Sequence, residues 1–562
     1  MRGRAKGIHV VMHAFRVVFV LLLLVGAIPW FAAAESSTQL YIGHRARLTA
    51  EIPADWAIPD FAGGDYKGDS GFVISQALSG DGLVEACDRV TTGGYIQQIA
   101  VKDVTWHGED ACQFEGTFDG SAAVGLVIPH LHPFSSGGEV FAFVLVLTDP
   151  DHFTEITDSI SFDPEHVTPQ LYLDSVLDLV EARAWYAGDV NWARFRTNAE
   201  PLVQNADTLE ETHWVIKDAL TNLGYWGDNH SGFIEDLAQL TVTRQQGLGI
   251  ILENRVVRIV YPDSPAGRAG VRVGDTVVAV DGLGFNGTRQ IQTGPGGLVT
   301  LSIVRHGVSQ PVMVEIESGP FNLYLPPIVE QTSDGMGYIE LFTTYGADPI
   351  QYVADGHEGI DRVDEAGACG WIVDVRRNAG GGYPPMVAGV GPLLGDGPIL
   401  QMETREGRVR MSIDYRDGNF YRNGVDTLNV VSTLPLPKLN APQPPVAILI
   451  GPGTVSAGED AAIAFIGRPD VRFFGEPSGG YTVGNSGYSL YDGAFLILAD
   501  SAITDRNSDT YIGGIEPDEI VRTDWTIYGT ADDPVIQAAT EWLEQQPGCA
   551  QATLVATTPE AG

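Results

Sequence analysis

The spacing of apolar residues changes along the chain and divides it into regions of different secondary structure. Residues 35–165 contain short apolar runs separated by Gly, Asp and Ser: LTAEIP (48–53), GFVISQAL (71–78), VFAFVLVL (140–147) and DSISF (158–162). Short runs bounded by turn-forming residues are typical of β-strands. We therefore expect a β-rich N-terminal domain over residues 35–165, to which the sequence assigns no role.

From residue 166 the apolar residues recur with the period of an α-helix. The segment LYLDSVLDLVEARAWY (171–186) has this spacing, and a second segment, TLEETHWVIKDALTNLGYW (208–226), opens with Thr208 and Glu211. A Thr followed three residues later by Glu forms a capping box, which marks the start of a helix. The pattern predicts a small helical module over residues 166–236 that leads into the loop GDNHSGF.

Strand-like segments return over residues 237–318, and two continuous apolar runs follow. WIVDV (371–375) and VAILI (446–450) do not alternate with polar residues, as expected of parallel strands with both faces buried. A tight turn and a helix follow VAILI. The segments VRFFGEPSGG and GAFLILADSAITD are expected to add further strands, and DPVIQAATEWLEQQ a final helix. We predict an α/β core over residues 319–545 and a flexible tail over 546–562.

The first 34 residues have the pattern of an export signal. Basic residues precede the apolar run VVFVLLLLVGAI (17–28), and three alanines follow at 32–34, which is the small-residue pattern that a signal peptidase accepts. We expect residues 1–34 to be a signal peptide, although an uncleaved membrane anchor shares these features. The mature protein is then exported to the periplasm or the extracellular space, or is tethered to the membrane at its start.

Export makes disulfides chemically accessible, and the chain has four cysteines. Cys87 and Cys112 both fall in the N-terminal domain, so a bond between them fits one domain. Cys369 lies in an apolar run and is expected to be an ordinary core residue. Four cysteines allow three pairings, and the sequence does not choose among them.

The excess of acidic residues disfavours some classes of binding partner. The 562 residues include 33 Lys and Arg against 72 Asp and Glu, for a formal net charge of −39. Nucleic acids and anionic membranes attract clustered Lys and Arg, so neither is an expected partner. A salt-adapted surface also explains this balance. The shortage is mainly of lysine, because the only lysines are Lys6, Lys67, Lys102, Lys217 and Lys438.

Within residues 237–318, the strings GLGI (247–250) and SPAGRAGVRVGDTVVAVDG (264–282) resemble a PDZ domain. In that family a peptide C-terminus adds as a strand at the sheet edge, and backbone N–H groups of the Gly-rich loop hold its carboxylate. The resemblance therefore implies that peptide C-termini bind at the loop formed by Gly247, Leu248, Gly249 and Ile250. The alternative is a rigid spacer with an empty groove.

Four further strings stand behind this segment in a fixed order: DVRRNAGGG, GPGTVSAGE, FGEPSGG and GGIEPDEIV. Together with the PDZ-like segment, they resemble the C-terminal processing (tail-specific) family of serine peptidases. The resemblance covers about residues 166–545. It implies a multidomain α/β and β protein, in which a crotonase-like α/β peptidase core contains an inserted PDZ domain. The small helical module and the β-rich N-terminal domain precede these parts.

The resemblance assigns Ser456 as the nucleophile. Ser456 lies at a predicted strand-to-helix turn, three residues before Glu459, as the nucleophile of the family does. Such a turn exposes a hydroxyl near helix N-terminal N–H groups. A serine that only caps a helix would also fit this position.

A serine hydroxyl needs a base, and here the sequence departs from many relatives. Those relatives carry a Lys five residues after the Glu of the GEP string. In this chain Glu476 begins that count, which ends at Tyr481, and no Lys follows Lys438. A Ser–Lys dyad is therefore not supported.

Another branch, like the tricorn protease core, uses a His from an earlier segment. No His follows His357, and His230 lies in GDNHSG, which resembles the GD-x-HS motif of that branch. We therefore expect His230 to be the base, with a loop His bonded to Asp228 as the alternative. A His base needs an orienting acceptor, and Asp505 and Glu516 are both candidates between which the sequence does not choose.

The resemblance also places the oxyanion hole. In the family, the Gly-rich loop and the residue after the nucleophile donate N–H groups to the tetrahedral intermediate. The corresponding donors here are Gly380 or Gly381, together with Ala457.

The sequence thus indicates an exported serine endopeptidase that acts on proteins or peptides with free C-termini. No cofactor is expected. His130 and His132 alternate as metal ligands on a strand can, but no third ligand is evident nearby, so no metal is expected. The alternative function is a catalytically inactive PDZ-containing binding or scaffold protein. The oligomeric state stays open.

Overall fold

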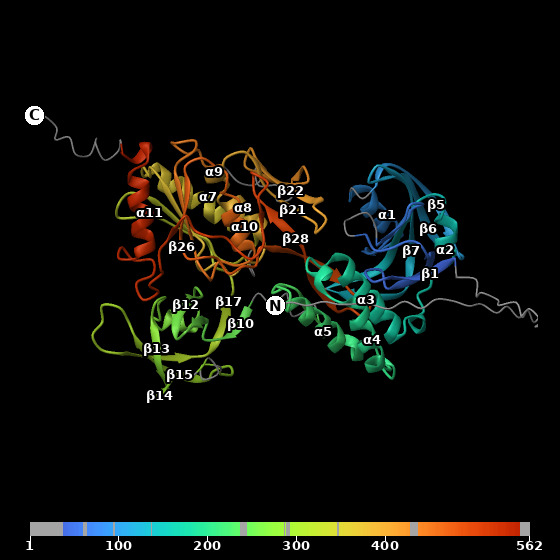
Figure 1. The fold of residues 1–562 in the computed structure, drawn as a ribbon, viewed down its shortest axis with the longest axis horizontal. Coiled ribbons are helices and arrows are strands. Elements are labelled where there is room, and N and C mark those ends of the chain that lie inside the picture. Colours follow the sequence, from blue (N-terminus) through green and yellow to red (C-terminus); the bar gives the residue numbers. More distant parts are fainter. Residues whose placement is uncertain are drawn as a thin grey trace, which may run out of the picture.

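The computed structural model describes residues 37–59, 65–93, 96–136, 138–236, 244–285, 287, 291, 293–344, 348–426 and 436–550. The predicted signal peptide and residues 551–562 of the predicted tail lie outside these ranges. The N-terminal domain and the parallel-sheet core lie toward opposite ends of the long axis (Figure 1). Within the described ranges, no helix is long and apolar enough to cross a membrane.

The N-terminal domain is β-rich, as predicted. Its main sheet is antiparallel, in the order β3-β4-β8-β7-β6-β5, and the hairpin β1–β2 packs beside it. The segment DSISF is not a strand: α2 (Phe153–Asp158) enters it, and Ser161 forms only an isolated bridge with Thr49. The other elements are β1 (Thr38–Gly43), β2 (Leu48–Pro53), β3 (Tyr66–Lys67), β4 (Phe72–Ser79), α1 (Leu83–Thr92), β5 (Gln97–Trp106), β6 (Glu109–Phe118), β7 (Ser121–Ser136) and β8 (Glu139–Thr148).

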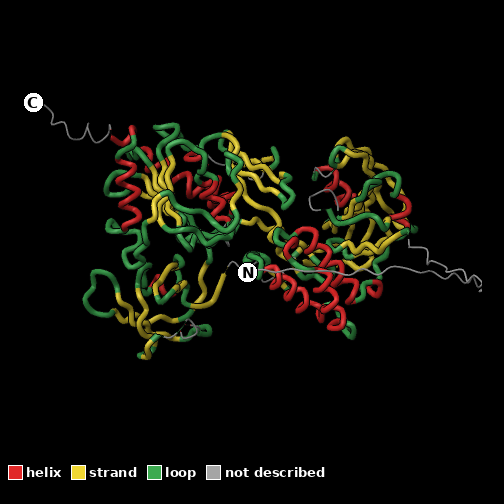
Figure 2. The backbone as a smooth tube through the Cα atoms, in the orientation of Figure 1, coloured by secondary structure: helices red, strands yellow, loops and turns green. Residues whose placement is uncertain are grey.

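The helical module contains three α-helices: α3 (Pro169–Arg183), α4 (Trp192–Val203) and α5 (His213–Gly224). These helices cluster beside the N-terminal domain (Figure 2). The capping box predicted the start of the last helix too early. Glu211 accepts hydrogen bonds from the backbone N–H groups of Asp207 and Thr208, but a 3₁₀ turn over Glu210–Thr212 intervenes before α5 begins.

The PDZ-like domain has a sheet in the order β11-β12-β13-β15-β16, and a separate pair, β10–β17, links its two ends. This pair extends the domain past the predicted boundary at residue 318. Its elements are β10 (Arg244–Gly247), β11 (Ile250–Glu253), β12 (Val256–Val260), α6 (Pro265–Arg268), β13 (Thr276–Val280), β14 (Leu283–Gly284), β15 (Leu298–Val304), β16 (Val312–Glu317) and β17 (Gly319–Asn322).

The core contains a six-stranded sheet in the order β18-β19-β20-β25-β26-β30, parallel from β19 onward. Both predicted apolar runs are central strands. Val373 and Ile448 pack with α7, α8 and α10 on one face, and Ile372 and Leu449 pack with α11 on the other. Burial on both faces explains why these runs do not alternate. The strands are β18 (Ile328–Gln331), β19 (Gly337–Glu340), β20 (Trp371–Asp374), β25 (Val446–Ile450), β26 (Val471–Gly475) and β30 (Glu519–Ile520), and the helices are α7 (Pro349–Glu365), α8 (Tyr383–Gly389), α9 (Gly391–Leu394), α10 (Ala457–Ile463) and α11 (Pro534–Glu544).

The strand predicted from GAFLILADSAITD belongs to a second, antiparallel sheet, rather than to the parallel one. This sheet has the order β24-β23-β22-β21-β28-β27, and β9 and β29 also pair with β28. Since β9 follows the helical module, the long strand β28 joins that module to the core. The strands are β9 (Gly232–Ile234), β21 (Gly397–Glu403), β22 (Val409–Arg416), β23 (Asn419–Arg422), β24 (Val425–Asp426), β27 (Val483–Ser489), β28 (Phe495–Thr504) and β29 (Thr510–Tyr511).

Two disulfides are present. Cys87 and Cys112 join α1 to β6 within the N-terminal domain, as the sequence suggested. Cys369 is not an ordinary core residue, because it bonds to Cys549 across a separation of 180 residues. This bond fastens the chain after α11 to the start of β20.

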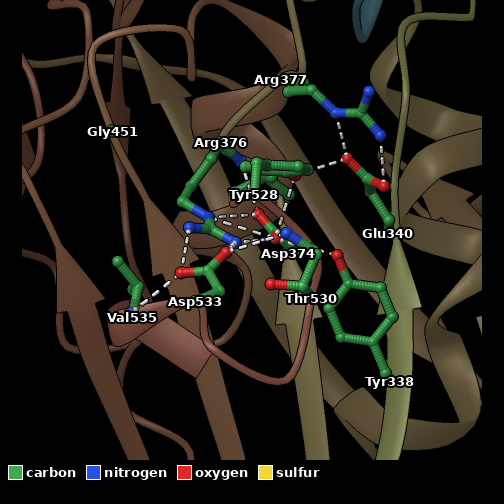
Figure 3. Close-up of polar contacts among 12 residues, drawn as sticks. Tyr338, Glu340, Asp374, Arg376, Arg377, Gly451, Tyr528, Thr530, Asp533 and Val535 are labelled. Atoms are coloured by element: carbon green, nitrogen blue, oxygen red, sulfur yellow. Dashed lines mark hydrogen bonds and ion pairs between the residues drawn. The ribbon is translucent and has the colours of Figure 1, made fainter. Parts of the chain in front are cut away.

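A buried ionic network lies at the carboxyl end of β20 (Figure 3). The Arg376 side chain is fully buried, and its Nη2 lies 2.6 Å from Asp374 Oδ2 and 2.9 Å from Asp533 Oδ2. Asp533 is also the N-cap of α11 and accepts a hydrogen bond from Val535 N. The two carboxylates therefore fix the end of β20 and the start of α11 to one guanidinium.

We expect Asp533→Ala to lower the free energy of unfolding by about 3–5 kcal/mol, because it removes one of two carboxylates that balance a buried charge. Urea denaturation of the full chain measures this loss. The matched control is Asp532→Ala, which alters the exposed neighbour and should change stability by less than about 0.5 kcal/mol. Equal effects of the two substitutions would contradict the structural role of the network.

Candidate active site

Ser456 lies where β25 turns into α10, as the sequence predicted. Its backbone has φ 53° and ψ −126°, a region that residues other than glycine rarely adopt. Such strain persists only where surrounding contacts impose it, and it is typical of functional sites. The turn leaves the Ser456 side chain partly exposed at the N-terminus of α10.

Glu459 imposes this conformation from within the helix. Its Oε2 accepts hydrogen bonds from Ser456 N (2.9 Å) and Tyr481 N (2.8 Å), and its Oε1 accepts from Gly480 N (2.9 Å) and the Ser478 hydroxyl. Burial raises the pKa of Glu459, although these four hydrogen bonds favour the ionised carboxylate. One carboxylate thus holds the turn of Ser456 against the segment 478–481.

The Gly-rich loop lies directly against the same turn. Gly380 and Gly381 both have positive φ (88° and 114°), and a Cβ placed on Gly380 would lie 2.9 Å from Ser456 Cβ. Two hydrogen bonds hold the loops together: Val455 N donates to Asn378 O at 3.0 Å, and Thr454 Oγ1 donates to Val375 O at 2.9 Å. Only glycine fits so close to the Ser456 side chain.

The structure distinguishes the two predicted glycine donors. Gly380 N already donates to Asn378 Oδ1 at 3.0 Å. For Gly381 N and Ala457 N, no acceptor is recorded within the described part of the chain. These two N–H groups are therefore the ones available to a substrate oxygen.

His230 lies between α5 and β9. Asp228 Oδ1 accepts hydrogen bonds from the backbone N–H groups of His230 and Ser231, which fixes the loop. The His230 ring points elsewhere: its Nδ1 lies 2.7 Å from Val483 O, and its edge meets the Tyr481 ring with centroids 5.5 Å apart. Burial lowers the pKa of His230, and the Val483 carbonyl and Asp228 oppose that shift.

The Val483 carbonyl accepts only, so Nδ1 must carry the proton in the neutral ring. Nε2 then has a free lone pair, which a general base requires. A continuous series of contacts joins His230 to Ser456: the His230 ring meets Tyr481, Tyr481 N binds Glu459, and Glu459 binds Ser456 N. Among the residues described, no direct hydrogen bond between His230 and Ser456 is recorded.

Neither predicted orienting carboxylate contacts His230. Asp505 is buried and accepts hydrogen bonds from Asn507 N, Asp509 N and the Tyr511 hydroxyl, so its oxygens stabilise a turn. Glu516 is exposed. The acceptor of His230 in this structure is a backbone carbonyl, which sequence patterns do not reveal because every residue carries one.

The predicted peptide-binding loop adopts a backbone conformation that requires glycine. Gly249 has φ 75°, and a Cβ there would lie 2.2 Å from Ser264 Cβ. Leu248 O and Gly249 O accept hydrogen bonds from Ala266 N and Tyr261 N. The strand that follows, β11, is at the edge of its sheet, where an added peptide strand would pair.

Comparison with known proteins agrees with this arrangement. Residues 335–521 match the model of peptidase family S41, and residues 256–303 match that of the PDZ domain. The chain therefore contains one segment similar to peptidase family S41 and one similar to the PDZ domain. The family resemblance and the fold class expected from the sequence are thereby confirmed.

Several known proteins are similar to this chain over longer or shorter stretches. It is 34% identical over 142 residues to the nisin-resistance protein of Lactococcus lactis, a match that covers 25% of this chain and 42% of that protein. It is 24% identical over 347 residues to the carboxy-terminal-processing protease of Bartonella bacilliformis, covering 58% and 74%. Among solved structures, the photosystem II D1 C-terminal processing protease has 20% identity and a TM-score of 0.44 over 66% of this chain and 97% of that one.

Sequence reasoning missed the contact between the Gly-rich loop and the PDZ-like domain. Arg377 binds Glu340 through Nε (2.6 Å) and donates from Nη1 to the backbone oxygen of Arg258 in β12 (2.9 Å). The Arg258 guanidinium stacks on Trp525, 3.5 Å from the ring centroid. The paired arginines of DVRRN are a visible signal, but apart from Asp374 their partners, Glu340, Arg258 and Asp533, lie more than 30 residues away along the chain.

We expect Asp460→Asn to stabilise the protein at neutral pH. Asp460 is 8% exposed, and no hydrogen bond or ion pair of its carboxyl is recorded within the described ranges. Burial, and secondarily the charge of Glu459, raise its pKa well above the usual value. A carboxyl with a raised pKa destabilises the folded state as pH rises above about 3.9, its value in the unfolded chain. Asparagine avoids that cost.

Thermal melts at pH 7 and pH 4 test this expectation. The variant should melt about 2 °C or more above the wild type at pH 7, and the gain should shrink at pH 4. Glu541→Gln removes an exposed carboxyl and serves as the control. If Asp460→Asn is less stable than the wild type at both pH values, the carboxylate has a stabilising partner and the argument fails.

Proposed function

We propose that this chain is an exported serine endopeptidase that hydrolyses protein substrates and binds their C-termini with its PDZ-like domain. The observation that carries the proposal is the environment of His230. Its Nδ1 is held by the Val483 carbonyl, and its ring meets the Tyr481 ring at a right angle. The backbone N–H groups of Tyr481 and Ser456 both donate to Glu459. Export is supported by the basic and apolar leader and by the two disulfides.

In the proposed mechanism, His230 Nε2 removes the proton from Ser456 Oγ as this oxygen attacks the substrate carbonyl. The N–H groups of Gly381 and Ala457 stabilise the oxyanion that forms. The protonated imidazole then gives its proton to the leaving amine, and water hydrolyses the acyl-enzyme in a second round of the same steps. The Val483 carbonyl keeps the ring in the required tautomer throughout.

Position 481 also supports the assignment of His230. In the family resemblance, this position holds the lysine base of many relatives, whereas here it holds Tyr481. The His230 ring meets the Tyr481 ring edge-on. A histidine from the loop before β9 thus stands beside the position from which a lysine would act, so the change of base does not require a different nucleophile.

The proposed substrate path begins at the PDZ-like domain. A peptide that adds to the free edge of β11 would place its carboxylate at the N–H groups of residues 247–250. The same domain contacts Arg377, which is three residues before Gly380. This contact therefore connects the domain that is proposed to bind the substrate to the loop that is proposed to stabilise the oxyanion.

The alternative, a catalytically inactive PDZ-containing scaffold, finds no support in the comparisons. Ser456 is the N-cap of α10 and forms a capping box with Glu459, but a serine that only capped a helix would not need φ 53°. Covalent labelling of Ser456 by a fluorophosphonate separates the two functions. The enzyme should be labelled, and a scaffold should not.

We expect Ser456→Ala and His230→Ala each to lower kcat/KM by at least about 10³-fold, because nucleophile and base act as a unit. The assay follows cleavage of an unstructured peptide with a free apolar C-terminus. Ser333→Ala and His107→Ala alter exposed residues of the same types and should leave the rate unchanged. Full activity in either site variant would exclude the mechanism.

The pH dependence of kcat/KM should report the state of His230. The base must be neutral, so activity is lost as pH falls through its pKa. Because burial lowers this pKa from 6.5, we expect the acid limb of the profile to have its midpoint below pH 6.5. A midpoint above that value would show either that His230 is not the base or that its surroundings favour the charged ring.

A further inference from the structure

A cavity of about 180 Å³ lies between the N-terminal domain and the tip of the hairpin β27–β28. The turn 44–47 of the hairpin β1–β2 forms one wall, and residues 489–495 form the opposite wall. An apolar cavity of about 150 Å³ binds benzene, so a cavity of this size suits a small ligand.

Arg47 dominates the polar lining of this cavity. Its backbone is in the left-handed region (φ 50°), and its guanidinium lies over the Phe134 ring, 3.9 Å from the centroid. Phe134 also stacks on Phe141, which lines the cavity as well, with centroids 5.4 Å apart. The Phe134 ring covers the guanidinium from one side, and Nη2 lies close to Gly493, where an added Cβ would be 2.7 Å away.

Neither Arg47 nor its exposed neighbour Arg45 has a hydrogen bond or ion pair recorded within the described part of the chain. Asp492 is the acidic residue whose charge acts most strongly on Arg47. That carboxylate is already occupied: it accepts from the Tyr172 hydroxyl and Ala494 N, and it lies 2.6 Å from His213 Nε2. Asp492 therefore attracts Arg47 without satisfying its donors.

Among the described residues, Arg45 and Arg47 thus keep their charge unpaired in a chain with 72 Asp and Glu against 33 Lys and Arg. A guanidinium has a planar fork of donors that matches a carboxylate, and stacking on an aromatic ring leaves this fork free. The stacked phenylalanines provide an apolar surface beside it. The charge of Asp492 disfavours a dianion such as phosphate relative to a singly charged carboxylate.

From this arrangement we infer that the cavity is a binding site for a carboxylate borne on a small apolar group, with Arg47 as its main ligand and Arg45 at its rim. The C-terminal residue of a peptide has this chemistry. The site lies in a different domain from the PDZ-like loop and does not depend on the proposed peptidase activity. It would give the N-terminal domain a role in ligand recognition.

The hairpin that closes this cavity also reaches the proposed catalytic base. Phe495, in the cavity wall, pairs with Ile234 of β9, and Val483, at the start of β27, holds the His230 ring. A ligand that bridges the N-terminal domain and this hairpin should stabilise their contact, since it binds only the folded arrangement.

The test uses N-acetyl-L-phenylalanine as the probe and the full chain with Ser456→Ala, so that catalysis does not interfere. Ligand-observed NMR titration measures its affinity. Because the PDZ-like loop is a second candidate site for carboxylates, the informative quantity is the Arg47-dependent part of the binding. We expect Arg47→Gln to raise the dissociation constant for this part of the binding at least about tenfold. N-acetyl-L-phenylalaninamide, which lacks the charge, should show no Arg47-dependent binding.

Further variants protect the test against a folding defect. Arg45→Gln alters an exposed side chain and should weaken the same binding a few-fold, and Arg47→Lys should restore only part of it, because it keeps the charge without the fork. Arg89→Gln makes the same charge change elsewhere in the N-terminal domain and should have no effect. Unchanged affinity in both Arg47→Gln and Arg45→Gln, or equal Arg47-dependent binding of the amide, would overturn the proposal. Tighter Arg47-dependent binding of inorganic phosphate would show that the carboxylate assignment is wrong.

Discussion

The pairing of buried Arg376 with Asp374 and Asp533 is the interaction on which the geometry of the candidate site depends. Removing a guanidinium and two carboxylates from water carries a large desolvation cost, which is offset only if the charges meet with good geometry. Here Nη2 of Arg376 lies within 3 Å of both carboxylates. The arrangement therefore does not tolerate displacement, and it fixes the direction in which the chain leaves β20.

That direction determines how the Gly-rich loop meets the nucleophile turn. The backbone oxygen of Arg376 lies so close to Gly453 that a Cβ there would be 2.5 Å away. Two residues later, Asn378 O accepts from Val455 N, the neighbour of Ser456. The proposed donors and the proposed nucleophile thus come from two loops that are positioned by one buried charge network.

The next arginine extends the same network toward the PDZ-like domain. The single O–H of Tyr528 lies between Glu340 Oε1 (2.6 Å) and Asp374 Oδ2 (3.0 Å), and so joins the carboxylate that binds Arg377 to the one that binds Arg376. Tyr528 also stacks on Trp525, with ring centroids 5.0 Å apart, and Trp525 in turn stacks on Arg258 of the PDZ-like domain. The interface between the two domains is therefore built from residues that also order the core of the site.

The parts of this structure that local sequence determines were predictable, and those that depend on distant contacts were not. Burial on both faces made the strands of the parallel sheet visible as unbroken apolar runs, and the steric needs of a tight turn made Gly380 and Ser456 visible as motifs. The bond between Cys369 and Cys549 spans 180 residues, so spacing gave no signal of it. The β28 run was recognised as a strand, but its place in a second sheet depends on pairing partners that periodicity does not encode.

The acceptor of His230 shows the same limit at the scale of one hydrogen bond. The sequence offers two carboxylates as the orienting residue, but the oxygens of Asp505 stabilise a turn and Glu516 is exposed. The group that holds the imidazole is the carbonyl of Val483, whose position is set by the pairing of β27 with β28 and not by the identity of the residue. A carboxylate at this place would raise the pKa of His230, whereas a neutral carbonyl orients the ring and allows burial to keep that pKa low. The choice of acceptor therefore favours a neutral imidazole, which is the form that a general base requires.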